Sequence, residues 1–326
     1  MNLPKPCIQR QSGLSLIELM VALAVSAILL LGVTTVYTAS KRSYQVTDEF
    51  AGLQENARFA LNVLTRNIRM AGFTGCGNLE FMEVNNNVKK DKEIDSDYDF
   101  TDDLLIVGYA ASDTWPNKPT DILDGTNAIT IRKGSACSAA LTGTMPNKNS
   151  AIETSGTCDF QKGEILLITD CETADIFEKT NTAEDKQENN GDLSKAYGSD
   201  AFVYKFEHLI YYIQNNTEGK PSLYQKLVGG AETELVPNVE DMVLNYGIDT
   251  DGNNSINEIR SSAAAVPAAD WSKVINVYVR LLFRSDEVGT ANKPYRFNGT
   301  DVAATDADKH YRKEFVTAIN LRNRTP

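Results

Sequence analysis

The sequence predicts an α+β protein in which one long N-terminal helix packs on an antiparallel β-sheet body. Residues 14–37 form an apolar run, and residues 38–72 continue without proline and with apolar side chains at helical spacing. Residues 73–326 alternate short strand-like runs with polar turns. The first half of this helix has the length of a membrane span, and its second half needs a sheet to cover one apolar face.

The composition is that of a globular protein with an acidic surface. The chain has 326 residues, of which 42% are hydrophobic and 23% charged, and its formal net charge is −12. A surface of that sign repels nucleic-acid phosphates and anionic lipid headgroups. Nucleic-acid binding is therefore not expected as the main activity.

The apolar run is predicted to cross a membrane. Between Leu14 and Tyr37 the chain carries one glycine and one charged residue, Glu18, and about 20 mainly apolar residues are enough to span a bilayer. Basic residues before the run favour a cytoplasmic N-terminus, although Lys41 and Arg42 beyond it weaken that bias. A secretory signal peptide is the alternative, but the nearby Ala-x-Ala at 22–24 lies inside the run and not at its polar end.

The polar continuation of the helix is predicted to be amphipathic. Leu53, Ala57, Leu61, Leu64 and Ile68 recur at intervals of three and four residues, so one helix is expected from about residue 14 to about residue 70. The sequence thus predicts a leader (1–13), a membrane-spanning half (14–37), an amphipathic half (38–72) and a β-rich body (73–326).

The start of the apolar run resembles the cleavage motif of type IV prepilins. This motif is the stretch Gly13-Leu14-Ser15-Leu16-Ile17-Glu18. The resemblance implies a pilin-like fold, and a prepilin peptidase that cuts after Gly13 on the cytoplasmic side and methylates the new amine of Leu14. An unpaired carboxylate in hydrocarbon costs several kcal/mol. Glu18 is therefore expected to pair with the Leu14 amine of its own chain or of an adjoining subunit, and so to favour assembly.

The body is predicted to contain eight strands. They are expected at 104–109, 128–133, 164–169, 202–213, 222–228, 239–246, 274–284 and 315–322, with a turn at 215–221 that makes the fourth and fifth a hairpin. The polar stretches at 85–99 and 181–200 are predicted to be solvated loops.

Several segments of the body resemble PilW-type minor pilins of type IV pilus systems. They are RNIRMAGFTGC, LLITDC followed by ADIF, VEDMVLNYGIDTDG, VINVYVRLLFRS and FVTAINLRNR. The resemblance implies a low-abundance subunit that initiates pilus assembly near the tip and supports twitching motility and adhesion. The partners that it implies are other minor pilins, the major pilin, the prepilin peptidase, the inner-membrane assembly platform and a tip adhesin.

The same resemblance leaves other functions open. The J-type minor pseudopilin of type II secretion shares the N-terminal motif, and a membrane-tethered adhesin or enzyme would differ only in its body. The expected location is the inner membrane, with a periplasmic body, and then the pilus at the cell surface. An enzyme is not expected, because the sequence has no nucleophile elbow, P-loop or dinucleotide fingerprint. His208, in a predicted strand, and His310, in a charged loop, are expected to be structural.

The four cysteines after the apolar run are an even set that allows three disulfide pairings. We favour Cys76 with Cys171, which would tie the helix end to the sheet, and Cys137 with Cys158, which closes a local loop. Each would contribute about 2 to 4 kcal/mol to the free energy of unfolding. A zinc site is the alternative, but the sequence has no C-x-x-C pair.

The stretch DTDGNNSINEIR carries oxygen ligands at alternate positions. They are the side chains of Asp249, Asp251, Asn253, Ser255 and Asn257. Such a set suits calcium, but the stretch departs from the EF-hand pattern at Asn254, where glycine is expected, and at Arg260, where glutamate is expected. In an irregular loop Glu258 could take the place of that glutamate, and the alternative is an Asp-Gly turn without an ion.

Overall fold

The computed structural model describes residues 13, 15–76, 79, 81–90, 93–156, 158–183, 186–189, 193–286, 294–303 and 310–324. The predictions for Leu14 and for the leader before Gly13 lie outside these residues. The chain divides into two compact units, Met1–Gly52 and Leu53–Pro326, and each is described by itself. Helix α1 (Leu16–Arg69) contributes residues to both.

The part of α1 in the first unit is apolar and exposed. It contains a window long and apolar enough to cross a membrane, and none of that window is buried by protein. Its threonines do not break the helix, because Thr34 and Thr38 donate their hydroxyls to the carbonyls of Leu30 and Thr34, one turn earlier. The hydroxyls are therefore satisfied without water, as a lipid environment requires.

The part of α1 in the second unit buries one face. The buried residues recur every three or four positions, which is the period of a helix face: Leu53, Ala57, Ala60, Leu64 and Ile68. Four of them were expected from the sequence. Leu61 was also expected there, but it is only half-buried, and Ala60 takes its place on the face.

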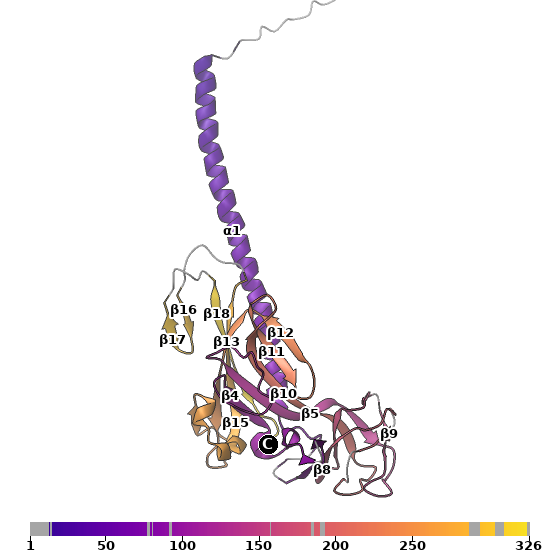
Figure 1. The fold of residues 1–326 in the computed structure, drawn as a ribbon. Coiled ribbons are helices and arrows are strands. Elements are labelled where there is room, and N and C mark those ends of the chain that lie inside the picture. Colours follow the sequence, from indigo (N-terminus) through magenta and orange to yellow (C-terminus); the bar gives the residue numbers. More distant parts are fainter. Residues whose placement is uncertain are drawn as a thin grey trace, which may run out of the picture. The chain divides into compact units, whose positions relative to one another are not determined.

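The second unit contains two main sheets (Figure 1). The larger sheet comprises β1 (Glu83–Asn86), β4 (Ile106–Ala110), β5 (Asn127–Leu141), β6 (Ile152–Ser155), β7 (Ile165–Thr169), β8 (Thr173–Glu178), β9 (Lys186–Gln187), β10 (Phe202–Asn215), β11 (Pro221–Leu227) and β12 (Glu232–Pro237). The smaller sheet runs in the order β14 (Glu258–Arg260), β13 (Val239–Ile248), β15 (Val274–Arg284) and β18 (Arg312–Asn320).

The remaining described elements are short. Two small hairpins pair β2 (Lys89–Lys90) with β3 (Glu93–Ile94) and β16 (Tyr295–Phe297) with β17 (Thr300–Val302). The 3-10 turns are η1 (Ser96–Tyr98), η2 (Asp102–Leu104), η3 (Ala263–Ala265) and η4 (Ala268–Lys273). Pairing is antiparallel throughout the described strands except between β1 and β8, which run parallel. The α+β fold with a largely antiparallel sheet is therefore confirmed.

Two predicted loops contain ordered structure. The stretch 85–99 includes the end of β1, the β2–β3 hairpin and η1. The stretch 181–200 contributes Leu193 and Tyr197, both fully buried, to the core. The prediction of solvated loops is wrong for these parts, because isolated apolar residues among polar ones give no periodic signal before tertiary packing buries them.

The C-terminal residues cap α1. The backbone N–H of Arg322 donates to the carbonyl oxygen of Arg69 at 3.0 Å, and the side-chain amide of Asn323 donates to the carbonyl of Ala71 at 2.9 Å. The last carbonyls of a helix have no partner within the helix, so these bonds supply one. The chain end after β18 is thereby fixed to the helix end.

Candidate functional site

The first turn of α1 is closed by Ser15 and Glu18. The Glu18 carboxylate accepts hydrogen bonds from the backbone N–H and the hydroxyl of Ser15, at 3.1 and 3.2 Å, and the backbone N–H of Glu18 donates to the Ser15 hydroxyl at 3.3 Å. These reciprocal bonds form a capping box. This role was not expected from the sequence, although the Ser-x-x-Glu spacing signals it.

This capping box also places the carboxylate next to the predicted cleavage point. Ser15 directly follows Leu14, so an oxygen bonded to the Ser15 N–H lies one residue from the position of the future amine. Gly13 is exposed at the same end. Negative charge is also favoured at a helix N-terminus by the helix dipole.

The four cysteines of the body form two disulfides. Cys76 bonds to Cys171 across 95 residues, and Cys137 bonds to Cys158 across 21 residues. This is the pairing that the sequence favours. The first bond joins the segment after α1 to the turn between β7 and β8, because Cys171 follows the end of β7 at Thr169. With the thiols consumed in pairs, the structure does not assemble the alternative zinc site.

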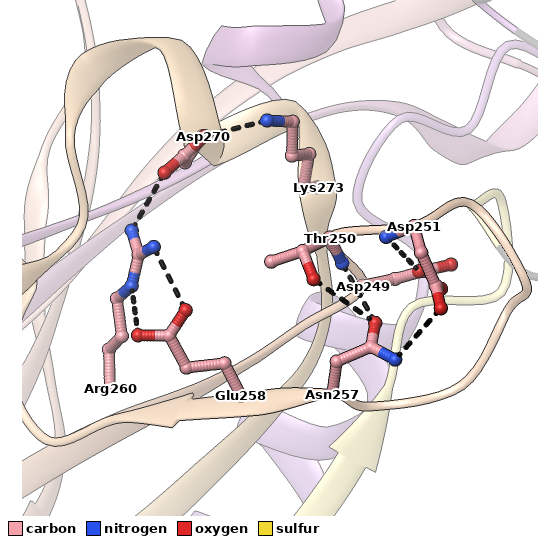
Figure 2. A network of polar contacts seen from close by, with 8 residues as sticks. All are labelled: Asp249, Thr250, Asp251, Asn257, Glu258, Arg260, Asp270 and Lys273. Carbon is pink, nitrogen blue, oxygen red and sulfur yellow. Dashed lines mark hydrogen bonds and ion pairs between the residues drawn. The ribbon is translucent and has the colours of Figure 1, made fainter.

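The loop between β13 and β14 brings several predicted calcium ligands together (Figure 2). Asp249 accepts the backbone N–H groups of four loop residues: Asp251, Gly252, Asn253 and Asn254. Asp251 accepts the side-chain amides of Asn253 and Asn257. The loop's own donors thus occupy these oxygens, and an ion would have to replace them. Calcium binding stays a prediction.

The hydrogen bonds of this loop also decide the pKa of Asp249. Burial of Asp249, which is 7% exposed, raises the pKa of its carboxyl. The hydrogen bonds from Asn254 and Gly252 outweigh burial and leave that pKa below its usual value. Among the described residues, no group of three or more His, Cys, Asp or Glu side chains is placed to hold a metal ion.

An ion-pair network lies beside this loop and includes Glu258, the predicted substitute ligand (Figure 2). Arg260 binds Glu258 through Nε at 3.0 Å and Asp270 of η4 through Nη1 at 2.8 Å. Lys273 adds a bond to Asp270 at 2.8 Å. Glu258, the proposed substitute ligand, is therefore bonded to a guanidinium.

The two histidines occupy structural positions. His208 of β10 is 3% exposed, and its Nδ1 lies 2.9 Å from the carbonyl oxygen of Asp97. Burial and the neighbouring Arg132 lower the pKa of His208 to about 3. Nδ1 of His310 lies 2.8 Å from the carbonyl oxygen of Ser285. Both side chains contact backbone carbonyls and so connect separate segments.

Two carboxylates of the body bind arginines that lie far away along the chain. Glu240 of β13 binds Arg312 of β18 through both oxygens, at 2.5 and 2.8 Å. Asp102 of η2 binds Arg324 at 3.2 Å. These arginines are 72 and 222 residues away along the chain. No local signal in the sequence could have paired them.

Asp175 is a fully buried carboxylate that the sequence analysis did not single out. Asn87 donates to it at 2.7 Å, and Ser194 and Tyr197 donate their hydroxyls, each at 2.6 Å. A buried carboxylate needs several donors when no cation is present. Asp175 thereby fixes the 193–197 segment to β8.

The fold and the helix start define a class. A long N-terminal helix with an exposed apolar half, a glycine and a glutamate at its beginning, and an antiparallel-rich sheet body are the features of a pilin-like protein anchored in a membrane.

Comparison with known families gives the particular type. Residues 8–34 match the family described as prokaryotic N-terminal methylation motif, and residues 210–323 match type IV pilus-assembly protein W. The two matches support a PilW-type pilin-like protein, a minor component of the type IV pilin kind. Such families are typically structural and interact with pilus assembly machinery. No curated protein matches the chain.

Proposed function

We propose that this protein is a minor pilin of a type IV pilus, cut after Gly13 and methylated at Leu14. The observation that carries the proposal is the pair of family matches, one over the helix start and one over residues 210–323, which include the smaller sheet and strands β11 and β12 of the larger one. The first bears on processing, because it covers Gly13 and Glu18. The second favours a pilus over a type II secretion pseudopilus, because its description names the pilus.

Glu18 is the assembly residue in this proposal. Its carboxylate already lies beside the Ser15 N–H, so removal of the leader would add a charged amine one residue away. The same amine on an adjoining subunit is the alternative partner. Either pairing removes an uncompensated charge from the membrane, which favours docking of one helix against the next.

The body is placed in the periplasm before assembly and at the cell surface afterwards. Two disulfides support that side of the membrane, since disulfides persist in oxidising compartments such as the periplasm. We place the subunit near the pilus tip, where it would help to initiate assembly with other minor pilins and contact a tip adhesin. The prepilin peptidase, the major pilin and the inner-membrane assembly platform are its other partners.

Deletion of the gene tests the class of assembly. The proposal predicts loss of surface pili and of twitching, with exoprotein secretion unchanged. Blocked secretion with normal pili would identify a J-type pseudopilin instead.

The N-terminal peptide of the membrane-bound protein should carry a methylated Leu14 by mass spectrometry, and a Gly13→Glu variant should keep its leader.

Calcium is proposed as an accessory ligand of the 249–257 loop, with its own test. Millimolar calcium should raise the melting temperature of the unmodified protein, and the Asp249→Asn, Asp251→Asn double variant should show no rise. Magnesium at the same concentration serves as the control ion. Absence of any calcium-dependent shift in the unmodified protein rejects the site.

A further inference from the structure

A hollow of about 500 Å³ lies between the end of α1 and the sheet. Val63, Arg66, Asn67 and Met70 line it from the helix, and residues of β5, β10 and β11 line it from the sheet. Beside the hollow, Asn67 of the helix donates to the Tyr211 hydroxyl of β10 at 2.7 Å. The volume of the hollow falls in the range of ligand-binding pockets.

Hydrogen bonds connect the wall of the hollow where the helix meets the sheet. The Asn67 side chain also donates to the carbonyl of Val63, and the Tyr211 hydroxyl donates to Gln225 of β11 at 2.8 Å. Each polar group in this chain of bonds therefore has a partner. A preformed wall of this kind lowers the cost of binding, because little has to be ordered when a ligand arrives.

The sheet side of the hollow carries charges where close packing would be expected. One helix turn away, Leu64 and Ile68 are fully buried. The surface that faces the hollow instead includes Lys133, Lys205 and Glu207. Interiors between a helix and a sheet are normally filled by apolar side chains at crystal-like density. A hollow with charged side chains in its wall is therefore a surface open to a ligand and not a packing gap.

Within the described part of the chain, the charged groups of this surface leave one cation, Arg66, without a carboxylate. Three cations, Arg66, Lys133 and Lys205, line the hollow with a single carboxylate, Glu207. Glu207 is bound to Lys133, and Lys205 reaches Glu164 at 2.7 Å. Among the described residues, the exposed guanidinium of Arg66 has no hydrogen-bond or ion-pair partner. On a chain with a net charge of −12, this local excess of positive charge is complementary to acidic groups.

We propose that this hollow, lined by Arg66, Lys133, Lys205 and Glu207, binds an acidic segment of an adjoining pilin-like subunit. Arg66 can take one carboxylate through two parallel N–H···O bonds, because its guanidinium is a planar fork of donors. The proposed function supplies the identity of the partner, whereas the carboxylate chemistry rests on the hollow alone. An acidic partner is available in any assembly that contains a second copy of this chain.

A binding assay on the full-length protein in a nonionic detergent tests this proposal. The probe is fluorescein-labelled hexaglutamate, followed by fluorescence anisotropy, with labelled hexaglutamine as the uncharged control. Hexaglutamate should bind, more weakly as salt is raised, because ion pairs are screened. Arg66→Glu should weaken binding by at least about tenfold, and Arg66→Gln by a smaller factor. Arg58→Glu is the matched control, since Arg58 is exposed on the same helix outside the hollow, and it should change binding less than about twofold.

Three results would overturn the proposal. They are no binding of hexaglutamate, equal binding of hexaglutamine, and an equal loss in the Arg58 and Arg66 variants. Displacement of the peptide by low millimolar inorganic phosphate would show a general anion site and would also count against an acidic segment. The assay needs no pilus, so a negative result here leaves the proposed function standing, and a failed deletion test leaves the hollow's chemistry standing.

Discussion

The carboxylate of Glu18 has a defined place at the first turn of α1. It accepts the N–H and the hydroxyl of Ser15, which satisfies donors that a helix N-terminus leaves without partners. After cleavage, the same oxygens would have a charged amine nearby. The residue can therefore stabilise the helix before processing. In the proposed function the same carboxylate would join subunits afterwards.

Asp241 gives a pH-dependent prediction at the level of one side chain. Burial raises the pKa of its carboxyl to about 6, against a weaker opposing hydrogen bond from the Met242 N–H, and one carboxylate oxygen is buried without a partner. The folded state then holds a proton that the unfolded chain has lost between about pH 4 and pH 6. Stability should accordingly fall as the pH rises through this window, and the penalty should be complete above it.

Replacement of Asp241 by asparagine should remove that penalty. The free energy of unfolding should rise by about 1 kcal/mol at pH 7.5, a modest figure because the side chain keeps partial contact with water. At pH 4 the variant and the parent should differ less. Urea denaturation at both pH values measures the difference, with Asp124→Asn on an exposed loop as control. A variant that is equally or less stable at pH 7.5 contradicts the account.

At the level of elements, the two disulfides should contribute differently to the free energy of unfolding. In the chain-entropy account a longer closed loop restricts the unfolded chain more. Serine replacement of both Cys76 and Cys171, which close a 95-residue separation, should lower the free energy of unfolding by about 4 kcal/mol. The same change at Cys137 and Cys158, separated by 21 residues, should cost about 3 kcal/mol. Denaturant titration of the two double variants decides the order, and the reverse order would refute the expectation.

The C-terminal segment is held in place by the side chain of Arg324. Arg324 is almost fully buried and donates to the carbonyls of Trp271, Val274 and Asp102 as well as to the Asp102 carboxylate. Arg324→Ala would remove these hydrogen bonds and the ion pair to Asp102, so we expect a loss of about 2 to 4 kcal/mol in the free energy of unfolding.

Arg322→Ala is the matched control for Arg324→Ala. Its side chain is exposed, and its backbone N–H still reaches Arg69 after the substitution. We expect a change within about 0.5 kcal/mol, measured by the same thermal or urea denaturation. Similar losses in the two variants would mean that the buried guanidinium does not fix the chain end.

Strands with strong local signals were predictable, and those with weak ones were not. The run at 274–284 coincides with β15, because its β-branched and apolar residues suit a buried strand. β5 extends eight residues past its predicted end at 133, through glycine, serine, alanine and cysteine, because pairing with β10 and β6 continues there. Small residues carry little strand propensity of their own, so only tertiary pairing reveals this part of β5.

Some of the functional residues were likewise predictable from the sequence, and others were not. Gly13, Glu18 and the cysteines stand out in the sequence by motif and by parity, and the structure shows the capping box and the two disulfides. The hollow beside α1 could not be predicted, because Arg66, Lys133 and Lys205 come from segments far apart in the sequence. Glu240 and Asp241 illustrate the same limit, since their environments depend on β15 and β18.

At the scale of the whole molecule, an apolar helix carries an acidic, disulfide-bonded body. In the proposed function, the helix would supply membrane insertion and helix–helix packing, and the hollow lined by Arg66 would bind an adjoining subunit. Assembly would then be controlled at two places. Glu18 would set the register of the helices, and the body would select which subunit lies beside it.

The central claim is that Glu18 acts in assembly, and incorporation of Glu18→Gln into pili tests it most directly. The amount of variant in sheared pili is compared with its amount in the inner membrane, with the unmodified protein and Ser15→Ala as references. The account predicts normal membrane insertion, normal cleavage after Gly13 and at least about a tenfold lower share in pili, because glutamine cannot pair with a charged amine as a carboxylate does. A Glu18→Gln protein that enters pili at the normal level would contradict it.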